Sequence, residues 1–215
     1  MKDLILFGDC KKTLSAFLPK SARMCVTSPP YYGLRDYGGE DKQIGQEDTP
    51  EEFINNLVEV FREVRDILTD DGTLWVNLGD SYYNYRPGKG QSYPKQTVSK
   101  TKQDLPDKCA KRANKLEGLK EKDLIGIPWL FAFAMRADGW YLRQDIIWHK
   151  PNPMPESVKD RCTKSHEYIF LFSKNKKYFY DNEAIKEPAK DWGTRDRTNG
   201  TVSYTHLTLP TSRSV

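Results

Sequence analysis

Metal-binding and disulfide patterns are missing from this chain. Its three histidines have no metal-ligand spacing, and no C-x-x-C pair occurs among its four cysteines, Cys10, Cys25, Cys109 and Cys162. These absences argue against a zinc site and against a disulfide framework. They fit a reducing cytoplasm, so we expect no metal and a cytoplasmic protein.

Long hydrophobic runs are also missing. The longest apolar stretch, residues 125–135, is too short to cross a bilayer, and no N-terminal signal peptide is visible. The 215 residues are 37% hydrophobic and 30% charged, as in one sizeable soluble domain. The net charge of +4 is too small to indicate a polyanionic partner by itself.

The positive charge is concentrated in residues 86–122, which hold 11 Lys or Arg against 4 Asp or Glu. Such a run can be a solvated loop. On an otherwise near-neutral protein it can also bind phosphate without reading sequence, and we favour that interpretation. The side chains expected to contact a nucleic-acid backbone are Lys89, Lys95, Lys100, Lys102, Lys111 and Arg112.

Apolar runs and helical patterns alternate in the first part of the chain. Residues 4–7 and 23–27 are predicted as buried strands, with a short helix over 11–18 between them. Thr49 followed by Pro50 and Glu52 predicts a helix start. Apolar residues at helical spacing follow, namely Phe53, Leu57, Phe61, Val64 and Leu68. A further strand over 73–78 completes a strand–helix–strand order that is typical of parallel α/β sheets.

The later part of the chain predicts a helix over 128–137 and strands over 141–148, 167–173 and 177–180. The polar turn 173–176 suggests that the last two strands form a hairpin. We therefore predict an α/β fold, with a mostly parallel sheet flanked by helices and an antiparallel hairpin at one edge.

Residues 27–31 read Thr-Ser-Pro-Pro-Tyr and follow the second predicted strand. Proline fixes φ, has no N–H and makes the preceding residue extended, so this segment is a rigid ledge of acceptors. A planar group with an exocyclic amine would donate to the Ser28 hydroxyl and the Pro29 carbonyl and stack on Tyr31. The same letters occur in polyproline linkers, but here they close an apolar run near the front of a folded region.

Ser28-Pro29-Pro30-Tyr31 resembles the catalytic signature of the amino-directed DNA methyltransferases, which modify N4 of cytosine or N6 of adenine. Three further regions resemble the family in the same order: residues 6–10, residues 72–80, and residues 145–153 followed by 166–170. The resemblance covers about residues 3–188. The early catalytic motif is similar to that of the permuted, β-type subgroup.

The resemblance implies a Rossmann-like fold, S-adenosylmethionine as methyl donor, and direct transfer to a base flipped out of double-stranded DNA. It implies catalytic roles for Ser28, Pro29, Pro30 and Tyr31. N4 of cytosine is favoured and N6 of adenine stays open. A cognate restriction endonuclease would be a further partner, in a prokaryotic or phage-encoded system.

The resemblance also implies roles for residues at other strand ends. Trp148 and Lys150 would line the base pocket with Tyr31, although a tryptophan in a strand is often core. The cofactor would contact Asp9, Thr27 and Asp80, although aspartates at strand ends are often plain turn formers. For Glu167 the plain structural interpretation, independent of the resemblance, is an ion pair with a lysine of the turn 174–177. Cys10 and Cys25 are interpreted as small buried residues and not as nucleophiles.

The permuted subgroup carries an Asp-Pro-Phe-x-Gly-x-Gly cofactor segment near its C-terminus, and this chain has none. Residues 203–211 look like translated sequencing adapter. We therefore expect an incomplete methyltransferase domain over 1–190, with the basic insertion 86–122. Residues 191–215 would be the start of a target-recognition region and an artificial tail. Two alternatives remain: a catalytically inactive DNA-binding fragment, and a protein glutamine methyltransferase, against which the basic segment argues.

Overall fold

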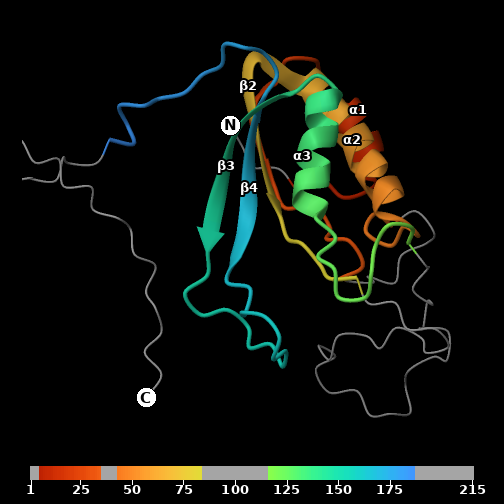
Figure 1. Ribbon diagram of the computed structural model, residues 1–215. Helices are drawn as coiled ribbons and strands as arrows, with labels where there is room; N and C mark the ends of the chain where they lie inside the picture. Colours follow the sequence, from red (N-terminus) through yellow and green to blue (C-terminus); the bar gives the residue numbers. More distant parts are fainter. Residues whose placement is uncertain (1–4, 35–42, 84–115, 187–215) are drawn as a thin grey trace, which may run out of the picture. The chain divides into compact units, whose positions relative to one another are not determined.

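The computed structural model describes residues 5–34, 43–83 and 116–186. The chain divides into two units, Met1–Phe179 and Tyr180–Val215, and the helices and strands of the described residues all lie in the first. They are, in chain order, α1 (Cys10–Ser15), β1 (Ala22–Thr27), α2 (Pro50–Ile67), β2 (Leu68–Leu78), α3 (Ile127–Ala137), β3 (Tyr141–His149) and β4 (His166–Ser173) (Figure 1).

Helix α2 begins where the sequence predicts. The Thr49 hydroxyl oxygen accepts a hydrogen bond from the Glu52 N–H at 3.2 Å, and Pro50 is the first helical residue. The cap satisfies one of the N–H groups that a helix start leaves without a partner. The predicted apolar stripe is buried along the helix. The structure differs from the prediction at Leu68, the last residue of the predicted helical stripe, where the backbone becomes extended and β2 begins.

The sheet of the described residues has the strand order β1-β2-β4-β3. Strands β1 and β2 are parallel, as predicted, but β2–β4 and β3–β4 are antiparallel. The prediction of a mostly parallel sheet is therefore wrong for this part of the chain, which forms a mixed sheet. The reason is that β4 inserts between β2 and β3 and runs opposite to both.

The predicted hairpin of residues 167–173 with 177–180 is also wrong. Strand β4 ends at Ser173, and residues 177–180 form no strand. Both edges of β4 already carry hydrogen-bonded partners, β2 on one side and β3 on the other. No free edge remains for a third partner. The antiparallel edge of the sheet is instead the β3–β4 pair.

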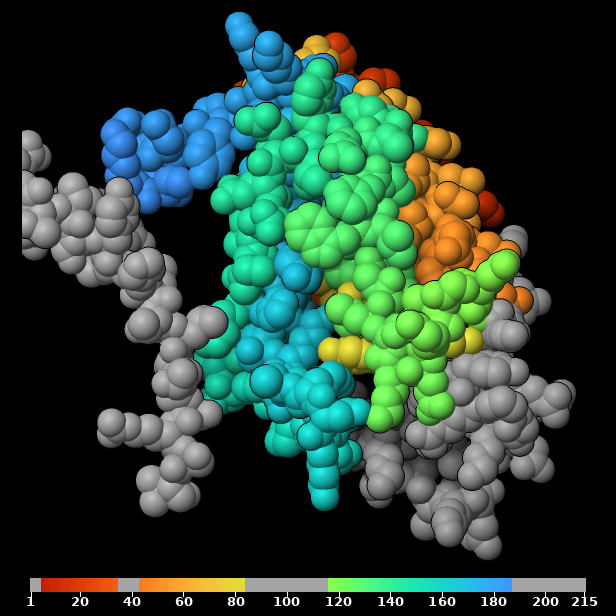
Figure 2. All heavy atoms as spheres, viewed as in Figure 1, coloured from red at the N-terminus to blue at the C-terminus, as the bar shows by residue number. Residues whose placement is uncertain are grey.

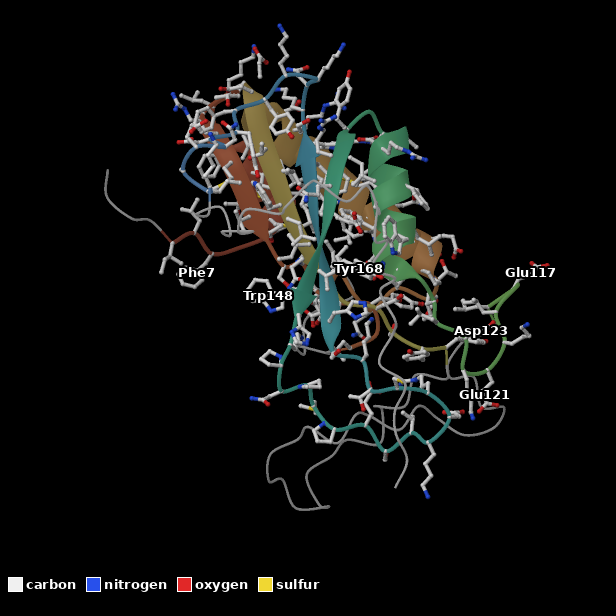
Figure 3. All side chains as sticks on the ribbon, turned by 60° about the vertical axis from the view of Figure 1, so that its left-hand side comes forward. Phe7, Glu117, Glu121, Asp123, Trp148 and Tyr168 are labelled. Atoms are coloured by element: carbon white, nitrogen blue, oxygen red, sulfur yellow. The ribbon has the colours of Figure 1, made fainter. Side chains whose placement is uncertain are left out.

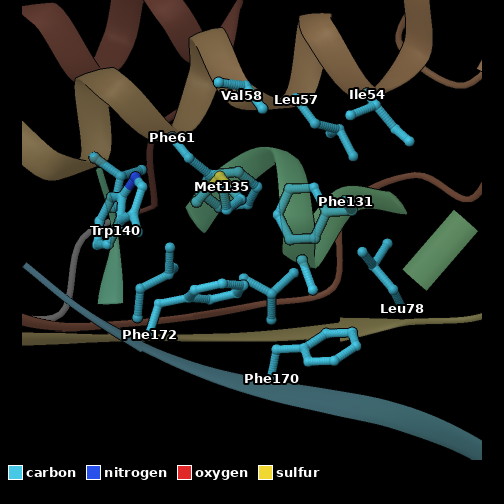
Figure 4. Packing of buried hydrophobic residues seen from close by; sticks show 14 of the residues in the cluster. Ile54, Leu57, Val58, Phe61, Leu78, Phe131, Met135, Trp140, Phe170 and Phe172 are labelled. Atoms are coloured by element: carbon cyan, nitrogen blue, oxygen red, sulfur yellow. The ribbon is translucent and has the colours of Figure 1, made fainter. Parts of the chain in front are cut away.

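Helices α1, α2 and α3 lie on one side of the sheet in Figure 1. Alternate residues of the two central strands point at them and are fully buried: Leu74, Val76, Leu78, Phe170 and Phe172. Phe61 and Phe131 meet them from α2 and α3, with ring centroids 5.5 Å apart (Figure 4). Side chains of α2 and α3 close over this face in the space-filling view (Figure 2). The core thus forms between β2–β4 and the two long helices.

The N-terminal segment differs from its prediction. Residues 5–7 form no strand, and Phe7 is 91% exposed and projects away from the sheet (Figure 3). Strand β1 forms as predicted but is not buried, with Val26 68% exposed. It is the outer strand of the described sheet and has one neighbour, β2. An apolar run predicts burial only where a second layer or strand covers it.

The two cysteines that the sequence analysis interpreted as buried differ in exposure. Cys10 begins α1 and is exposed, so its interpretation as a buried residue is wrong, while Cys25 is partly buried. Helix α1 is also shorter than the predicted 11–18. Among the residues that the structure describes, no helix is long and apolar enough to cross a membrane, and no cluster of His, Cys, Asp and Glu could hold a metal ion.

Candidate active site

Four strand ends meet at one edge of the sheet. Thr27, the last residue of β1, lies beside Val76 of β2, and Asn77 lies beside Ile169 of β4. Trp148, near the end of β3, lies opposite Glu167 of β4. Because β4 runs against its neighbours, its first residues lie at the edge where the other three strands end. The Ser-Pro-Pro-Tyr segment leaves β1 at this edge.

The ledge itself is partly open to solvent and is backed by Gly45. Ser28 and Pro30 are exposed, and Pro29 and Tyr31 are partly buried. A Cβ at Gly45 would lie 3.1 Å from the Tyr31 carbonyl oxygen and 3.3 Å from the Pro30 Cβ, and its φ of +101° favours glycine. A glycine backbone therefore packs directly behind the ledge, which leaves the Ser28 side accessible.

The Tyr31 hydroxyl belongs to a polar network that the sequence did not reveal. It donates to Glu167 Oε2 at 3.0 Å. The Asn77 amide nitrogen donates to the same oxygen at 3.1 Å and to the Tyr31 hydroxyl oxygen at 3.3 Å. The Lys150 ammonium pairs with the other carboxylate oxygen, Oε1. The Glu167 carboxylate thus joins groups from three other segments of the chain at this edge.

The electrostatics of this network follow from its charges. Burial raises the pKa of Glu167, but hydrogen bonds from Lys150, Asn77 and Tyr31 and the charge of Lys150 outweigh it and leave that pKa below 4.5. Burial also raises the pKa of Tyr31; a hydrogen bond with Ser28 lowers it, and the Glu167 charge raises it again. Near neutral pH the site therefore holds a carboxylate and a neutral phenol.

The Tyr31 ring packs against Gly79, just beyond the end of β2. A Cβ at Gly79 would lie 2.6 Å from Cε2 and 2.9 Å from Cδ2 of the ring. Carbon atoms in contact are normally about 3.5–4.0 Å apart. A side chain at this position is thus incompatible with the observed ring position, and Gly79 is there for close approach.

The residues predicted for the base pocket lie at this edge. Trp148 is 55% exposed, so the alternative that it belongs to the core is wrong. Figure 3 shows it near the end of β3, with Tyr168 on the neighbouring strand. Lys150 is paired with Glu167, whereas the sequence predicted a lysine of the 174–177 turn for that carboxylate. Lys174 instead donates to the Leu68 carbonyl at 2.9 Å.

The residues predicted to hold a cofactor have local structural partners. Asp9 Oδ1 accepts from the Lys11 and Lys12 N–H groups at the start of α1. Asp80 Oδ1 accepts from the N–H groups of Ser81, Gly126 and Ile127, at 2.9, 3.0 and 3.0 Å, and so caps α3. Both aspartates are helix-capping residues in this structure. Their roles toward a cofactor, and that of Thr27, stay predictions.

Several predicted positions lie outside the described residues. These are the basic side chains Lys89, Lys95, Lys100, Lys102, Lys111 and Arg112, most of the insertion 86–122, and the segment 191–215. Sequence reasoning in turn missed Asn77, Gly79 and the role of Glu167. A signal existed for Asn77, because a polar side chain in an otherwise apolar central strand is an informative exception. Nothing local marked Gly79 or joined Glu167 to Tyr31.

Comparisons with known proteins identify the family of this chain. The sequence model of a DNA methylase family, the N6/N4 methyltransferases, matches residues 22–212. The Type II methyltransferase M.Cfr9I of Citrobacter freundii is 51% identical over 190 residues, which are 88% of this chain and 60% of the relative. The chain therefore spans about three fifths of the length of that relative.

Two solved structures share the fold. The cytosine-N4-specific PvuII DNA methyltransferase has a TM-score of 0.55 at 19% identity, over 81% of this chain and 50% of that one. A Thermus thermophilus protein, solved in complex with S-adenosyl-L-methionine, has a TM-score of 0.52 at 22% identity, over 86% of this chain and 55% of that one. From the match of the family sequence model to most of its length, this chain belongs to the N6/N4 DNA methylase family.

Proposed function

We propose that this chain is a site-specific DNA methyltransferase, which transfers a methyl group to the exocyclic amine of a flipped base. N4 of cytosine is the favoured acceptor and N6 of adenine the second. The observation that carries the proposal is the accessible Ser28-Pro29 ledge beside a Tyr31 ring held by Glu167 and Gly79. Membership of the DNA methylase family supports a DNA substrate over the protein glutamine alternative.

In the proposed reaction the amine donates one N–H to the Ser28 hydroxyl oxygen and the other to the Pro29 carbonyl. The two acceptors draw the N–H bonds out of the ring plane, so the nitrogen lone pair is no longer delocalised into the base. Stacking on Tyr31 would add about 1–3 kcal/mol, by analogy with single-strand stacking. A base inside a duplex cannot reach this ledge, so the proposal includes base flipping.

S-adenosylmethionine is the proposed methyl donor and would supply an electrophilic methyl group when bound. Its carbon–sulfur bond would break as the nitrogen–carbon bond forms, S-adenosylhomocysteine would leave, and the surplus amine proton would pass to solvent at the exposed Ser28. The PvuII and Thermus thermophilus folds support a Rossmann-like domain for this cofactor. Asp9 and Asp80 use Oδ1 for backbone N–H groups, so their Oδ2 atoms are the acceptors that a ribose hydroxyl would require. The two carboxylates therefore have the chemistry that binding the cofactor ribose requires. Thr27, beside the ledge, would contribute a hydroxyl.

The proposal extends to partners and location. Membership of the DNA methylase family supports DNA as the substrate, and the bacterial relatives support a prokaryotic or phage origin. Double-stranded DNA, a cognate restriction endonuclease and a cytoplasmic location remain part of the proposal. The basic segment 86–122 would contact the DNA backbone, and raising the salt concentration should then weaken DNA binding steeply.

A tritiated-methyl transfer assay with duplex DNA tests the proposal. The chain should label DNA, and digestion should release N4-methylcytosine or N6-methyladenine. Ser28→Ala removes one acceptor from the ledge and should lower the rate by about 100-fold, the scale for losing one preorganised hydrogen bond. Ser15→Ala, in exposed helix α1, is the matched control. Absence of label with the folded chain would contradict the proposal.

The inactive DNA-binding fragment is a second candidate, because residues 1–215 contain no Asp-Pro-Phe-x-Gly-x-Gly segment. Titration calorimetry with S-adenosylmethionine separates the two. Micromolar binding by this chain refutes the inactive fragment, whereas DNA binding without cofactor binding supports it.

A further inference from the structure

The Glu167 side chain interacts with three other side chains, although its position at the start of β4 requires no such interactions. Its side chain is 18% exposed and contacts Tyr31, Asn77 and Lys150, from the segment after β1, from β2 and from the segment after β3. It does not point into the core, because the neighbouring residues Tyr168 and Phe170 face the helices. Its interactions are all with the active-site edge.

Tyr31 is constrained at both ends by this arrangement. Its hydroxyl is tied to Glu167 and Asn77, and its ring edge lies against the Gly79 backbone. A tyrosine side chain has two rotatable bonds before its ring. A fixed hydroxyl together with a blocked ring edge leaves one position for the ring plane.

We propose that Glu167 is a positioning residue, which acts through the Tyr31 hydroxyl to hold the ring where a flipped base would stack. Lys150 pairs with the other carboxylate oxygen, Oε1, and keeps the carboxylate ionised and oriented. The Asn77 amide donates to both oxygens of the hydrogen bond between Tyr31 and Glu167, namely the Tyr31 hydroxyl oxygen and Glu167 Oε2. The link between Glu167 and Tyr31 stands on geometry alone. Its use in base stacking rests on the proposed methyltransferase function.

A fixed Tyr31 ring matters because a flipped base would stack on the face of that ring. A free tyrosine would lose rotamer entropy each time a base arrived. A ring already held by Glu167 and Gly79 avoids that loss. The carboxylate is therefore expected to act on turnover through the base, and not on the binding of S-adenosylmethionine.

Ultraviolet titration of the Tyr31 phenol tests the link without requiring activity. The signal of Tyr31 is the difference between the titration curves of the chain and of Tyr31→Phe. In Glu167→Gln the Tyr31 transition should move to lower pH, because the negative charge that opposes phenolate formation is lost. Glu167→Asp keeps the charge, so its Tyr31 transition should lie closer to that of the unaltered chain. Glu59→Gln, which removes an exposed ion pair between helix α2 and Lys11, should leave the Tyr31 titration unchanged.

Methyl transfer gives the second measurement. Glu167→Gln should lower kcat by about tenfold or more, with the KM for S-adenosylmethionine unchanged. An unshifted Tyr31 titration in Glu167→Gln, with circular dichroism showing an intact fold, overturns the inference. A shifted titration in a chain that labels no DNA supports the positioning of Tyr31 and contradicts the methyltransferase function. A shifted titration with unchanged kcat overturns the role in turnover.

Discussion

Replacing Gly79 by alanine tests how tightly the Tyr31 ring is held. Gly79 is not among the glycines with positive φ, so an alanine there meets no backbone strain. The added methyl group would lie 2.6 Å from Cε2 of the ring. Since carbon contacts are normally about 3.5–4.0 Å, the ring must retreat by about 1 Å. It cannot swing freely, because its hydroxyl is bonded to Glu167.

Two consequences follow from a retreat of about 1 Å. The hydrogen bond from Tyr31 to Glu167, now 3.0 Å, would lengthen beyond hydrogen-bonding range. A misplacement of about 1 Å at a reacting centre can lower the rate about 100-fold, and we expect a loss of that order in methyl transfer. Overpacking should also destabilise the fold by about 1–3 kcal/mol. For a chain of this size each kcal/mol lowers Tm by about 2–4 °C.

Methyl transfer, thermal unfolding and the Tyr31 titration together measure the effect. The control is Gly139→Ala, just before β3, where the φ of +96° causes strain and the nearest atoms belong to the flexible Arg65 side chain, so it destabilises the fold without moving Tyr31. Gly79→Ala should lose activity well beyond Gly139→Ala at similar stability. Equal activity of Gly79→Ala and the unaltered chain, with an unchanged Tyr31 titration, would refute the reasoning.

Three further predictions concern stability. Thr49→Ala removes the cap of α2 and should cost about 1 kcal/mol of unfolding free energy in urea, with Thr49→Ser retaining most of it. Asp80→Ala leaves three backbone N–H groups, two of them at the start of α3, without their acceptor and should cost about 1–3 kcal/mol, whereas an effect below that of Thr49→Ala would contradict its capping role. Glu167 has a folded pKa below its ordinary 4.5, so its stabilisation is present above about pH 4.5 and is lost as pH falls through the lowered value. Thermal unfolding across this acidic range should therefore show a smaller pH dependence in Glu167→Gln, and an identical dependence would count against the network.

The local elements of the fold were predictable because their signals are local. Thr49, Pro50 and the apolar stripe that follows predict α2 by capping chemistry and helical spacing alone, and α2 forms there. The strand ending at Leu78 and the helix ending at Ala137 were predicted in the same way. Strand pairing was not predictable, because an apolar run does not state which neighbour or direction it will take. The insertion of β4 between β2 and β3 is such a choice.

Side-chain burial, like strand pairing, was not predictable from local sequence alone. Residues 5–7 and β1 have the composition of buried strands, yet Phe7 and Val26 are exposed in the described structure. Composition gives the tendency to be buried, while burial itself requires a covering layer supplied by other parts of a protein. Trp148 shows the reverse case, since a tryptophan in a strand looks like core and lies open at the active-site edge.

The sequence by itself determined the chemistry of the ledge: two prolines fix the backbone, and Ser28 and Tyr31 offer a hydroxyl and a ring. These properties depend on the covalent structure of neighbouring residues, so they can be predicted from residues 27–31 alone. Only the tertiary structure decided what holds Tyr31 in place. Glu167 lies 136 residues away along the chain, and Gly79 acts by having no side chain at a point of contact. Contacts of this kind arise when strands from distant parts of the chain meet at one edge, and no local pattern records them.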